Sequence, residues 1–317
     1  MPYAELQREL DERAALGLLR QRQMLQGPQS PHIVIGEKPY LAFCSNDYLG
    51  LANHPQLIAA LQQGSSQYGV GAGAAHLVSG HSVAHHRLEQ ALAAFVGKPA
   101  ALLFSTGYMA NLGTVQALVD KGDTVFADKL NHASLNDAML LSRATVKRYR
   151  HNDMAQLSQL LEQAKNGRKL IITDAVFSMD GDLAPLPELL ALCERHDAWL
   201  LADDAHGFGV LGEQGRGSLF NFKSPLPPFC KGGLSKLASA SSPLCKRGVG
   251  GDLISPRIIY MATLGKAAGV FGAFVAAEQV VIDTLVNHAR SYVYTTATPP
   301  ALASAVLGSL KLIGQGD

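Results

Sequence analysis

The sequence predicts an α/β fold with a mostly parallel central sheet and helices on both faces. Two observations predict it: short apolar segments that end in small or polar residues, and helical patterns that lie between several of these segments. This alternation is typical of parallel sheets that are buried on both faces. Because ligands of such sheets gather at the carboxyl ends of the strands, we expect the functional site there.

The apolar segments are the expected strands, and they lie at 99–106, 123–128, 169–177, 198–205, 256–265 and 272–277. Helical periodicity is clear in 82–97, where Ser82 is a candidate N-cap and Gly97 a candidate stop. The segments 157–167 and 186–197 show the same pattern.

Composition excludes several classes of protein. The chain has 27 basic and 26 acidic side chains and a net charge of +1, which favours neither nucleic acid nor a membrane surface as partner. No apolar run reaches the length of a membrane span, and the charged N-terminus does not resemble a signal peptide. We therefore expect a cytoplasmic protein. Its four cysteines have no CxxC spacing, so we expect neither disulfides nor a metal site.

The segment 223–255 departs from this pattern, since it is dense in Ser, Pro, Gly and Lys and contains a degenerate internal repeat. Such a composition favours a flexible surface insertion. A lid or a partner-binding loop is the alternative.

The segment 198–205 raises a chemical question because this apolar strand runs into Asp203 and a second aspartate. A buried carboxylate is costly unless a partner offsets its charge. Lys266 follows another expected strand and lies among small residues, where a desolvated amine can form a Schiff base. The sequence is not a P-loop, because Tyr260 and Ala267 occupy positions that require Gly and Ser or Thr.

Pyridoxal phosphate (PLP) would satisfy both groups. Its pyridine nitrogen needs a buried carboxylate such as Asp203, and its phosphate needs a helix N-terminus and hydroxyl donors. Three further residues fit the phosphate: the backbone N–H groups of Gly107 and Tyr108, and the hydroxyl of Thr263. His132 is a candidate to face the ring.

His206 is a candidate to reach the phenolic oxygen of PLP, because glycines after it let the chain leave the extended form. The glycine-rich segment 69–80 contains a weak match to a dinucleotide fingerprint, but a helical pattern precedes it, which favours a tight loop on the substrate side. We expect His85 and His86 to be surface residues of a helix and not ligands.

Six ordered motifs resemble the α-oxoamine synthases, which are PLP enzymes of the aspartate-aminotransferase fold, also called fold type I. The motifs are SNDYLGL (45–51), FSTGYMAN (104–111), NHASL (131–135), VFSMDGDLAPL (176–186), DDAHGFGVLGEQGRG (203–217) and TLGKAAG (263–269). The resemblance covers nearly the whole chain apart from 223–255.

The resemblance implies a role for each matching residue. Lys266 would carry PLP and act as catalytic base, Asp203 would hold the pyridine nitrogen, and His132 would stack on the ring. The remaining matches are Ser178 and His206 near the phenolic oxygen, Gly107, Tyr108 and Thr263 at the phosphate, and Arg20, in the N-terminal helix, and Asn46 at the substrate.

The branch that the chain resembles most joins L-alanine to a pimeloyl thioester, carried on CoA or acyl carrier protein, in biotin biosynthesis. The family implies a homodimer with a shared site, in which hydroxyls of 294–301 reach the neighbouring subunit's phosphate. Two alternatives stay open: another α-oxoamine synthase, such as a 2-amino-3-ketobutyrate CoA ligase, or a catalytically inactive remnant.

Three domains are expected: an N-terminal helical arm (1–45), a PLP-binding large domain (46–285) and the start of a C-terminal domain (286–317). Relatives continue beyond this point with an arginine that binds the amino-acid carboxylate, so we expect a largely missing small domain. We also expect 299–313 to leave an exposed apolar patch that favours association.

Overall fold

The computed structural model describes residues 2–164, 166–220 and 252–316, and its chain forms two compact units, residues 1–45 and 46–317. The first unit contains the helix α1 (Ala4–Ala15) and an antiparallel hairpin of β1 (His32–Ile35) and β2 (Lys38–Leu41). The expected helical arm is therefore helical only in part. Whether 46–285 and 286–317 are separate domains stays a prediction.

Arg20 is not in the N-terminal helix, contrary to the sequence prediction. The helix α1 ends because Gly17 adopts a left-handed conformation (φ 66°), and Leu18 N–H donates to the Arg13 carbonyl at 2.8 Å. This is the usual arrangement at a glycine-terminated helix. Arg20 lies beyond it in an irregular segment.

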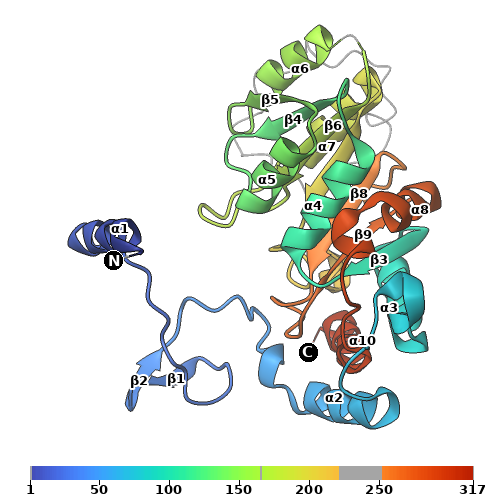
Figure 1. Ribbon diagram of the computed structural model, residues 1–317. Coiled ribbons are helices and arrows are strands. Elements are labelled where there is room, and N and C mark those ends of the chain that lie inside the picture. The colour runs from blue at the N-terminus through green and yellow to red at the C-terminus, as the bar shows by residue number, and fades with distance from the viewer. Residues whose placement is uncertain (1, 165, 221–251, 317) are drawn as a thin grey trace, which may run out of the picture. The chain divides into compact units, whose positions relative to one another are not determined.

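The second unit is built on a seven-stranded sheet in the order β3-β9-β8-β7-β6-β4-β5 (Figure 1). Within this sheet, β9 runs antiparallel to both of its neighbours, β3 and β8, and every other neighbouring pair is parallel. The predicted fold class, a mostly parallel sheet covered by helices, is confirmed. The strands are β3 (Ala100–Phe104), β4 (Thr124–Asp128), β5 (Thr145–Tyr149), β6 (Lys169–Asp174), β7 (Trp199–Asp203), β8 (Ile258–Thr263) and β9 (Ala273–Ala277).

All six predicted strands are present in this sheet. Sequence reasoning missed its seventh strand, β5, and also the hairpin strands β1 and β2 of the first unit. The strand β5 carries Lys147 and Arg148 and lies at the edge of the sheet, where charged side chains reach solvent. An edge strand of this kind lacks the apolar run that marks its buried neighbours, so the sequence pattern could not reveal it.

Helices cover both faces of the sheet (Figure 1). One face packs against α4 (Gly107–Leu118), α5 (Ala133–Leu141), α8 (Gln279–His288) and α9 (Arg290–Val293). The other packs against α3 (Val83–Phe95), α6 (Met154–Gln163), α7 (Leu186–His196) and α10 (Pro300–Gln315). No helix of the described residues is long and apolar enough to cross a membrane.

Alternation along β7 shows how both faces are filled. Leu200 and Ala202 belong to one hydrophobic cluster and Leu201 to the other, and all three are fully buried. Successive side chains of a strand point to opposite faces, so a strand buried on both sides must be apolar throughout. This explains why the strands appear as continuous apolar runs in the sequence.

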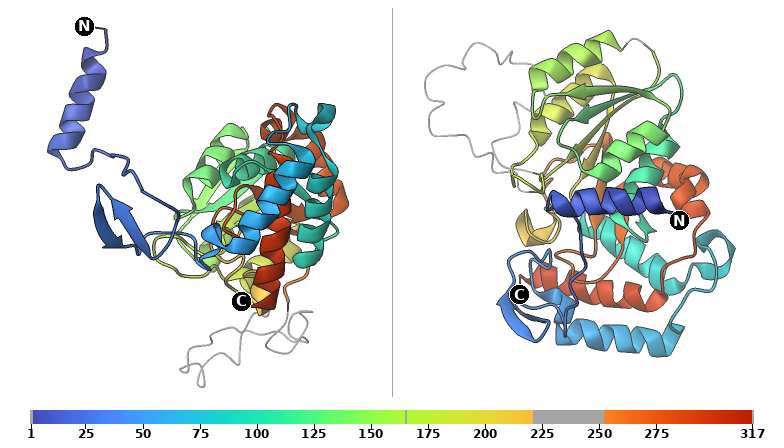
Figure 2. Two further views of the ribbon diagram at one scale, coloured as in Figure 1. Left: turned by 90° about the horizontal axis from the view of Figure 1, so that it is seen from below. Right: turned by 60° about the vertical axis from the view of Figure 1, so that its left-hand side comes forward.

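The helices α2 (Pro55–Tyr68) and α10 lie side by side although they are far apart in the sequence (Figure 2). A Cβ atom at Gly64 would lie 2.7 Å from Ser304 Oγ, so the two helices need a glycine here. No residue from Pro300 to Leu310 is exposed. The predicted apolar patch on 299–313 is therefore wrong, because α2 and α3 cover this helix.

The helix α3 begins after Ser82 and is followed by Gly97 in a left-handed conformation, as predicted. The prediction for His85 is wrong: its side chain is fully buried. Its Nδ1 accepts from Ser82 N–H at 3.0 Å, and its Nε2 lies 2.8 Å from the Thr298 carbonyl oxygen. His86 is exposed, as expected.

Most of the predicted insertion 223–255 lies outside the described residues, but the residues on either side of the gap are joined. Leu253 N–H donates to the Leu219 carbonyl at 2.7 Å, and Arg216 forms an ion pair with Asp252 at 3.3 Å. The core of the fold is therefore closed across the gap by its own contacts.

We predict that replacement of residues 221–251 by a linker of about four Gly and Ser residues leaves the fold intact. The new linker is about one eighth as long as the segment it replaces. Because each twofold shortening of a loop lowers the entropic cost of closing it by about 0.6 kcal/mol, the free energy of unfolding should rise by up to roughly 2 kcal/mol. Urea unfolding of the shortened and full chains measures this difference. Loss of cooperative unfolding in the shortened chain would contradict an insertion that the core does not need.

Candidate active site

Three neighbouring strands end at one pocket. Asp174 and Asp203 are the last residues of β6 and β7 and lie opposite each other in the register, and Thr263 is the last residue of β8. Parallel strands bring their carboxyl ends to the same edge of a sheet. The pocket there has a volume of about 170 Å³.

Eight of the ten predicted site residues line this pocket. They are Gly107, Tyr108, His132, Ser178, Asp203, His206, Thr263 and Lys266. Asn46 does not line it but is connected to His206 through Tyr48. Arg20 belongs to the first compact unit, so its position at the substrate stays a prediction.

Asp203 is held in place from two sides. Asn111 Nδ2, from α4, donates to its Oδ2 at 2.7 Å, and Ala205 N–H donates to its Oδ1 at 3.0 Å. Asn111 is fully buried, and its Nδ2 also donates to the Ser134 hydroxyl at 2.9 Å. Burial raises the pKa of Asp203, although these hydrogen bonds and the charge of Lys266 act against the shift. The carboxylate therefore favours a cationic partner in the pocket.

Asp174 adds a second buried carboxylate to the same wall of the pocket. Burial, followed by the charge of Asp203, raises its pKa to about 8. His132 N–H donates to its Oδ2 at 3.0 Å, whereas its buried Oδ1 has no hydrogen-bond partner among the described residues. When both groups are ionised, this wall carries two like charges, so a cation or a hydrogen-bond donor in the pocket stabilises the pair.

The neighbour Asp204 faces away from the pocket and is satisfied internally. Its Oδ2 accepts from Ser218 N–H at 2.7 Å and from the Tyr260 hydroxyl at 2.8 Å. Burial raises its pKa to about 6. The two adjacent aspartates thus have different roles: Asp204 binds the 205–218 loop to the sheet, and Asp203 is left for the pocket.

Lys266 is connected to a chain of hydrogen bonds. Its Nζ lies 2.7 Å from His206 Nε2, His206 Nδ1 lies 2.7 Å from the Tyr48 hydroxyl, and that hydroxyl donates to Asn46 Oδ1 at 3.1 Å. With the Tyr48 hydroxyl donating its proton to Asn46, His206 donates from Nδ1 to the Tyr48 oxygen. Its Nε2 then accepts from the lysine amine.

The electrostatics of this chain favour a neutral histidine. Burial, followed by the charge of Lys266, lowers the pKa of His206 to about 4. Burial also lowers the pKa of Lys266, and the charges of Asp203 and Asp174 partly offset this effect. A lysine with a lowered pKa reaches its nucleophilic, neutral form more readily than an exposed one.

The N-terminus of α4 forms another wall. Thr106 caps the helix by accepting from Met109 N–H at 3.2 Å, and Gly107 and Tyr108 follow it. A Cβ at Gly107 would lie 2.7 Å from Thr263 Cγ2, so glycine is required for this close approach. Free N–H groups at a helix N-terminus, next to a hydroxyl, form a site for an anion such as phosphate.

Sequence reasoning missed four residues that support the site: Asp174, Asn111, Ser134 and Tyr48. A signal existed for Asp174, because the apolar run KLIITD ends on an aspartate as WLLAD does. Asn111, Ser134 and Tyr48 belong to motifs that the analysis had quoted, but their contacts join distant elements that spacing alone does not connect.

The pocket fits PLP by its own chemistry. The buried Asp174 Oδ1 without a partner and the raised pKa of Asp203 call for a cation, which a protonated pyridine supplies. Gly107, whose lack of a side chain lets Thr263 approach, begins a helix N-terminus suited to phosphate. Lys266 provides the amine for the aldehyde.

Comparison with known protein families and curated sequences agrees with this chemistry. Residues 38–316 match the family Aminotransferase class I and II. The 8-amino-7-oxononanoate synthase of Nitrosospira multiformis is 61% identical over 311 residues, which cover 98% of this chain and 71% of that protein. That of Chromobacterium violaceum is 56% identical, over 97% of this chain and 72% of the relative.

Solved structures give the same result. A serine palmitoyltransferase from S. paucimobilis, bound to a PLP–myriocin aldimine, matches with a TM-score of 0.83 and 28% identity, covering 99% of this chain and 73% of that one. An 8-amino-7-oxononanoate synthase from Francisella tularensis matches with a TM-score of 0.67 and 32% identity, over 86% of this chain and 68% of the other.

The hydrogen-bond chain predicts the tautomer of His206. We expect its proton on Nδ1 in the unmodified chain, and a mixture of tautomers in Tyr48→Phe, which removes the acceptor of that proton. Two-bond ¹H–¹⁵N correlation spectra distinguish the tautomers, with His206→Asn to assign the signal. Tyr108→Phe is the matched control and should leave the tautomer unchanged. A proton on Nε2 in the unmodified chain would contradict the arrangement.

Proposed function

The chain belongs to the class I and II aminotransferase family and, within it, to the 8-amino-7-oxononanoate synthases, and from this premise we propose that it joins L-alanine to a pimeloyl thioester. The reaction releases carbon dioxide and the free thiol and forms 8-amino-7-oxononanoate for biotin biosynthesis. The observation that carries the proposal is the meeting of Lys266 and Asp203 in one pocket at a helix N-terminus.

PLP is the cofactor, and the residues of the pocket divide its binding between them. Gly107, Tyr108 and Thr263 hold the phosphate, and Asp203 holds the protonated pyridine nitrogen. Ser178 and His206 serve the phenolic oxygen, and His132 lies on the ring. The pocket supports this division because its walls supply an anion site, a buried carboxylate and an amine.

When bound, PLP supplies an aldehyde for amine exchange and an electron sink that stabilises negative charge on the amino-acid Cα. The chain's own groups do the rest. Lys266 Nζ, whose pKa burial lowers, takes the proton from Cα, and His206 Nε2 orients this amine from 2.7 Å. Asp203, fixed by Asn111, keeps a proton on the ring nitrogen.

Substrate binding and assembly complete the proposal. Arg20 and Asn46 contact the substrate, and His132 contacts both substrate and ring. The chain acts in the cytoplasm as a homodimer with a shared site, in which the hydroxyls of 294–301 serve the partner's phosphate. The printed names of the relatives support the reaction, and the acyl carrier is CoA or acyl carrier protein.

We predict that Lys266→Ala lowers turnover by more than about 10⁴-fold, because the variant loses both the amine and the base. Product formation from L-alanine and pimeloyl-CoA, followed by mass spectrometry, measures the loss. Lys311→Ala, at an exposed position of α10, is the matched control and should keep full turnover. Borohydride reduction should fix PLP to Lys266 in the unmodified chain. Substantial turnover by Lys266→Ala would sink the assignment.

Substrate preference separates the proposal from its alternatives. The same chemistry on glycine and an acetyl thioester gives 2-amino-3-ketobutyrate, so the two substrate pairs can be compared directly. We expect a kcat/KM for L-alanine with pimeloyl-CoA that exceeds the value for glycine with acetyl-CoA by at least about 100-fold. The reverse order would indicate a 2-amino-3-ketobutyrate CoA ligase. PLP binding without turnover of either pair would indicate an inactive remnant.

A further inference from the structure

A second cavity, of about 470 Å³, is lined by imidazoles and shares no residue with the PLP pocket. It lies next to β3 and α8, and its polar lining includes His76, His81, His86 and Glu89. His76 begins a π-helical turn (His76–Gly80), and His81 follows that turn directly. The fully buried His85 of α3 adjoins them.

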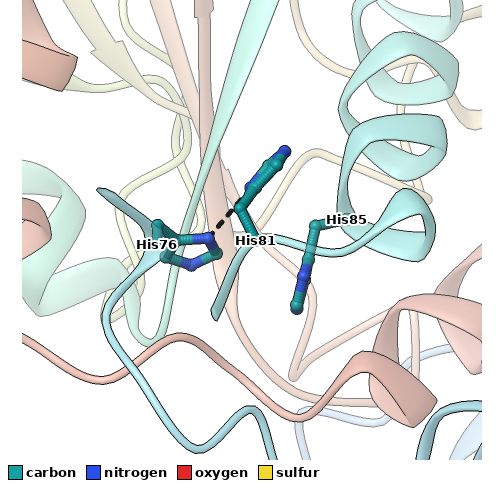
Figure 3. A group of neighbouring side chains, drawn as sticks. All are labelled: His76, His81 and His85. Carbon is teal, nitrogen blue, oxygen red and sulfur yellow. Dashed lines mark hydrogen bonds between the residues drawn. The ribbon is translucent and has the colours of Figure 1, made fainter. Parts of the chain in front are cut away.

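Three of these histidines are close enough to share one ion. One ring nitrogen from each of His76, His81 and His85 lies within 4.8 Å of the other two (Figure 3). His76 Nδ1 and His81 Nδ1 are 3.0 Å apart. Nitrogens bound to one Zn²⁺ at about 2.0–2.1 Å lie roughly 3.4 Å from each other, a value close to the 3.0 Å separation of the His76 and His81 nitrogens.

The outer ring nitrogen of His85 has, and that of His81 lies near, a partner of the kind that metal-bound histidines use. His85 Nε2 donates to the Thr298 carbonyl at 2.8 Å, which leaves the lone pair on Nδ1. His81 Nε2 lies 3.7 Å from Glu89 Oε2, a carboxylate whose Oε1 is held by Leu103 N–H at 3.0 Å. A carbonyl or carboxylate in this position fixes the tautomer and raises ligand basicity.

The third ring is held by stacking. His76 lies parallel to Tyr292, with ring centroids 5.0 Å apart and an angle of 13° between planes. Imidazole is among the commonest ligands of Zn²⁺. Three contacts would yield to the ion: those of Ser82 N–H and Ser82 Oγ with His85 Nδ1, at 3.0 and 3.1 Å, and the 3.0 Å contact between the Nδ1 atoms of His76 and His81.

We propose that His76, His81 and His85 form a Zn²⁺ site, with one ring nitrogen from each as ligand, beside the 470 Å³ cavity that His76 and His81 line. The ion joins the turn at 76–80 to α3 and, through Thr298, to the segment before α10. Glu89 is a positioning residue for His81. A rival set, His81, His86 and Glu89, also brings its ligand atoms together.

Isothermal titration of the untagged, PLP-loaded chain with ZnCl₂, after removal of metal with a chelator, tests the site. We expect about one Zn²⁺ per chain. His81→Asn and His76→Asn should each lower the affinity at least about 100-fold, and Glu89→Gln about 10–100-fold. His86→Asn is the matched control and should bind as the unmodified chain does. Co²⁺ in place of Zn²⁺ should give the intense visible absorbance of a tetrahedral complex.

His81 is exposed, so His81→Asn should fold even if the buried His76 does not tolerate replacement, and the visible absorbance of bound PLP reports a native pocket. Absence of stoichiometric Zn²⁺ binding to the unmodified chain would overturn the proposal. So would unchanged affinity in a folded His81→Asn variant. Loss of binding in His86→Asn, with retention in His76→Asn, would assign the ion to the rival set and equally reject the proposed ligands.

Discussion

The buried pair Asp174 and Asp203 is the constraint on which the rest of the active site depends. The two carboxylates lie at the ends of adjacent strands, and burial raises the pKa of both. Charge of one sign cannot accumulate in a low-dielectric pocket without a counter-charge. Lys266 supplies part of it, and a protonated pyridine can supply the remainder. The fold therefore places negative charge where a cationic cofactor can compensate it.

Asp204 can be tolerated beside Asp203 because its own hydrogen bonds satisfy it away from the pocket. A third free carboxylate in the pocket, in addition to Asp174 and Asp203, would bring a further negative charge without a partner. The strand places Asp204 on the other side, where a backbone N–H and the Tyr260 hydroxyl satisfy it. The same residue anchors Ser218, so the loop that carries His206 is held at both of its ends.

Sequence reasoning succeeded for features that a single segment of the sequence reveals. The buried strands are continuous apolar runs, and Asp203, Lys266 and Gly107 each lie at the end of an element, where a local pattern marks them. It failed where a feature depends on contacts between segments that are far apart in the sequence. Nothing in AFVAA distinguishes the antiparallel β9 from a parallel strand. The burial of His85 depends on contacts with Thr298, more than two hundred residues away, and could not be seen from helical spacing.

The helix α4 shows how one element can position both ends of an elongated ligand. Gly107 begins the helix at the anion site, and Asn111 lies four residues later, about 6 Å along the axis and on the same face. Asn111 orients Asp203 and, through Ser134, is tied to α5, whose N-cap is His132. A shift of α4 would therefore disturb Gly107, Asp203 and His132 together, the three residues proposed for the phosphate, the pyridine nitrogen and the ring. One helix thus positions the groups that the proposed function needs, and its packing against β8 and β9 helps to set their geometry.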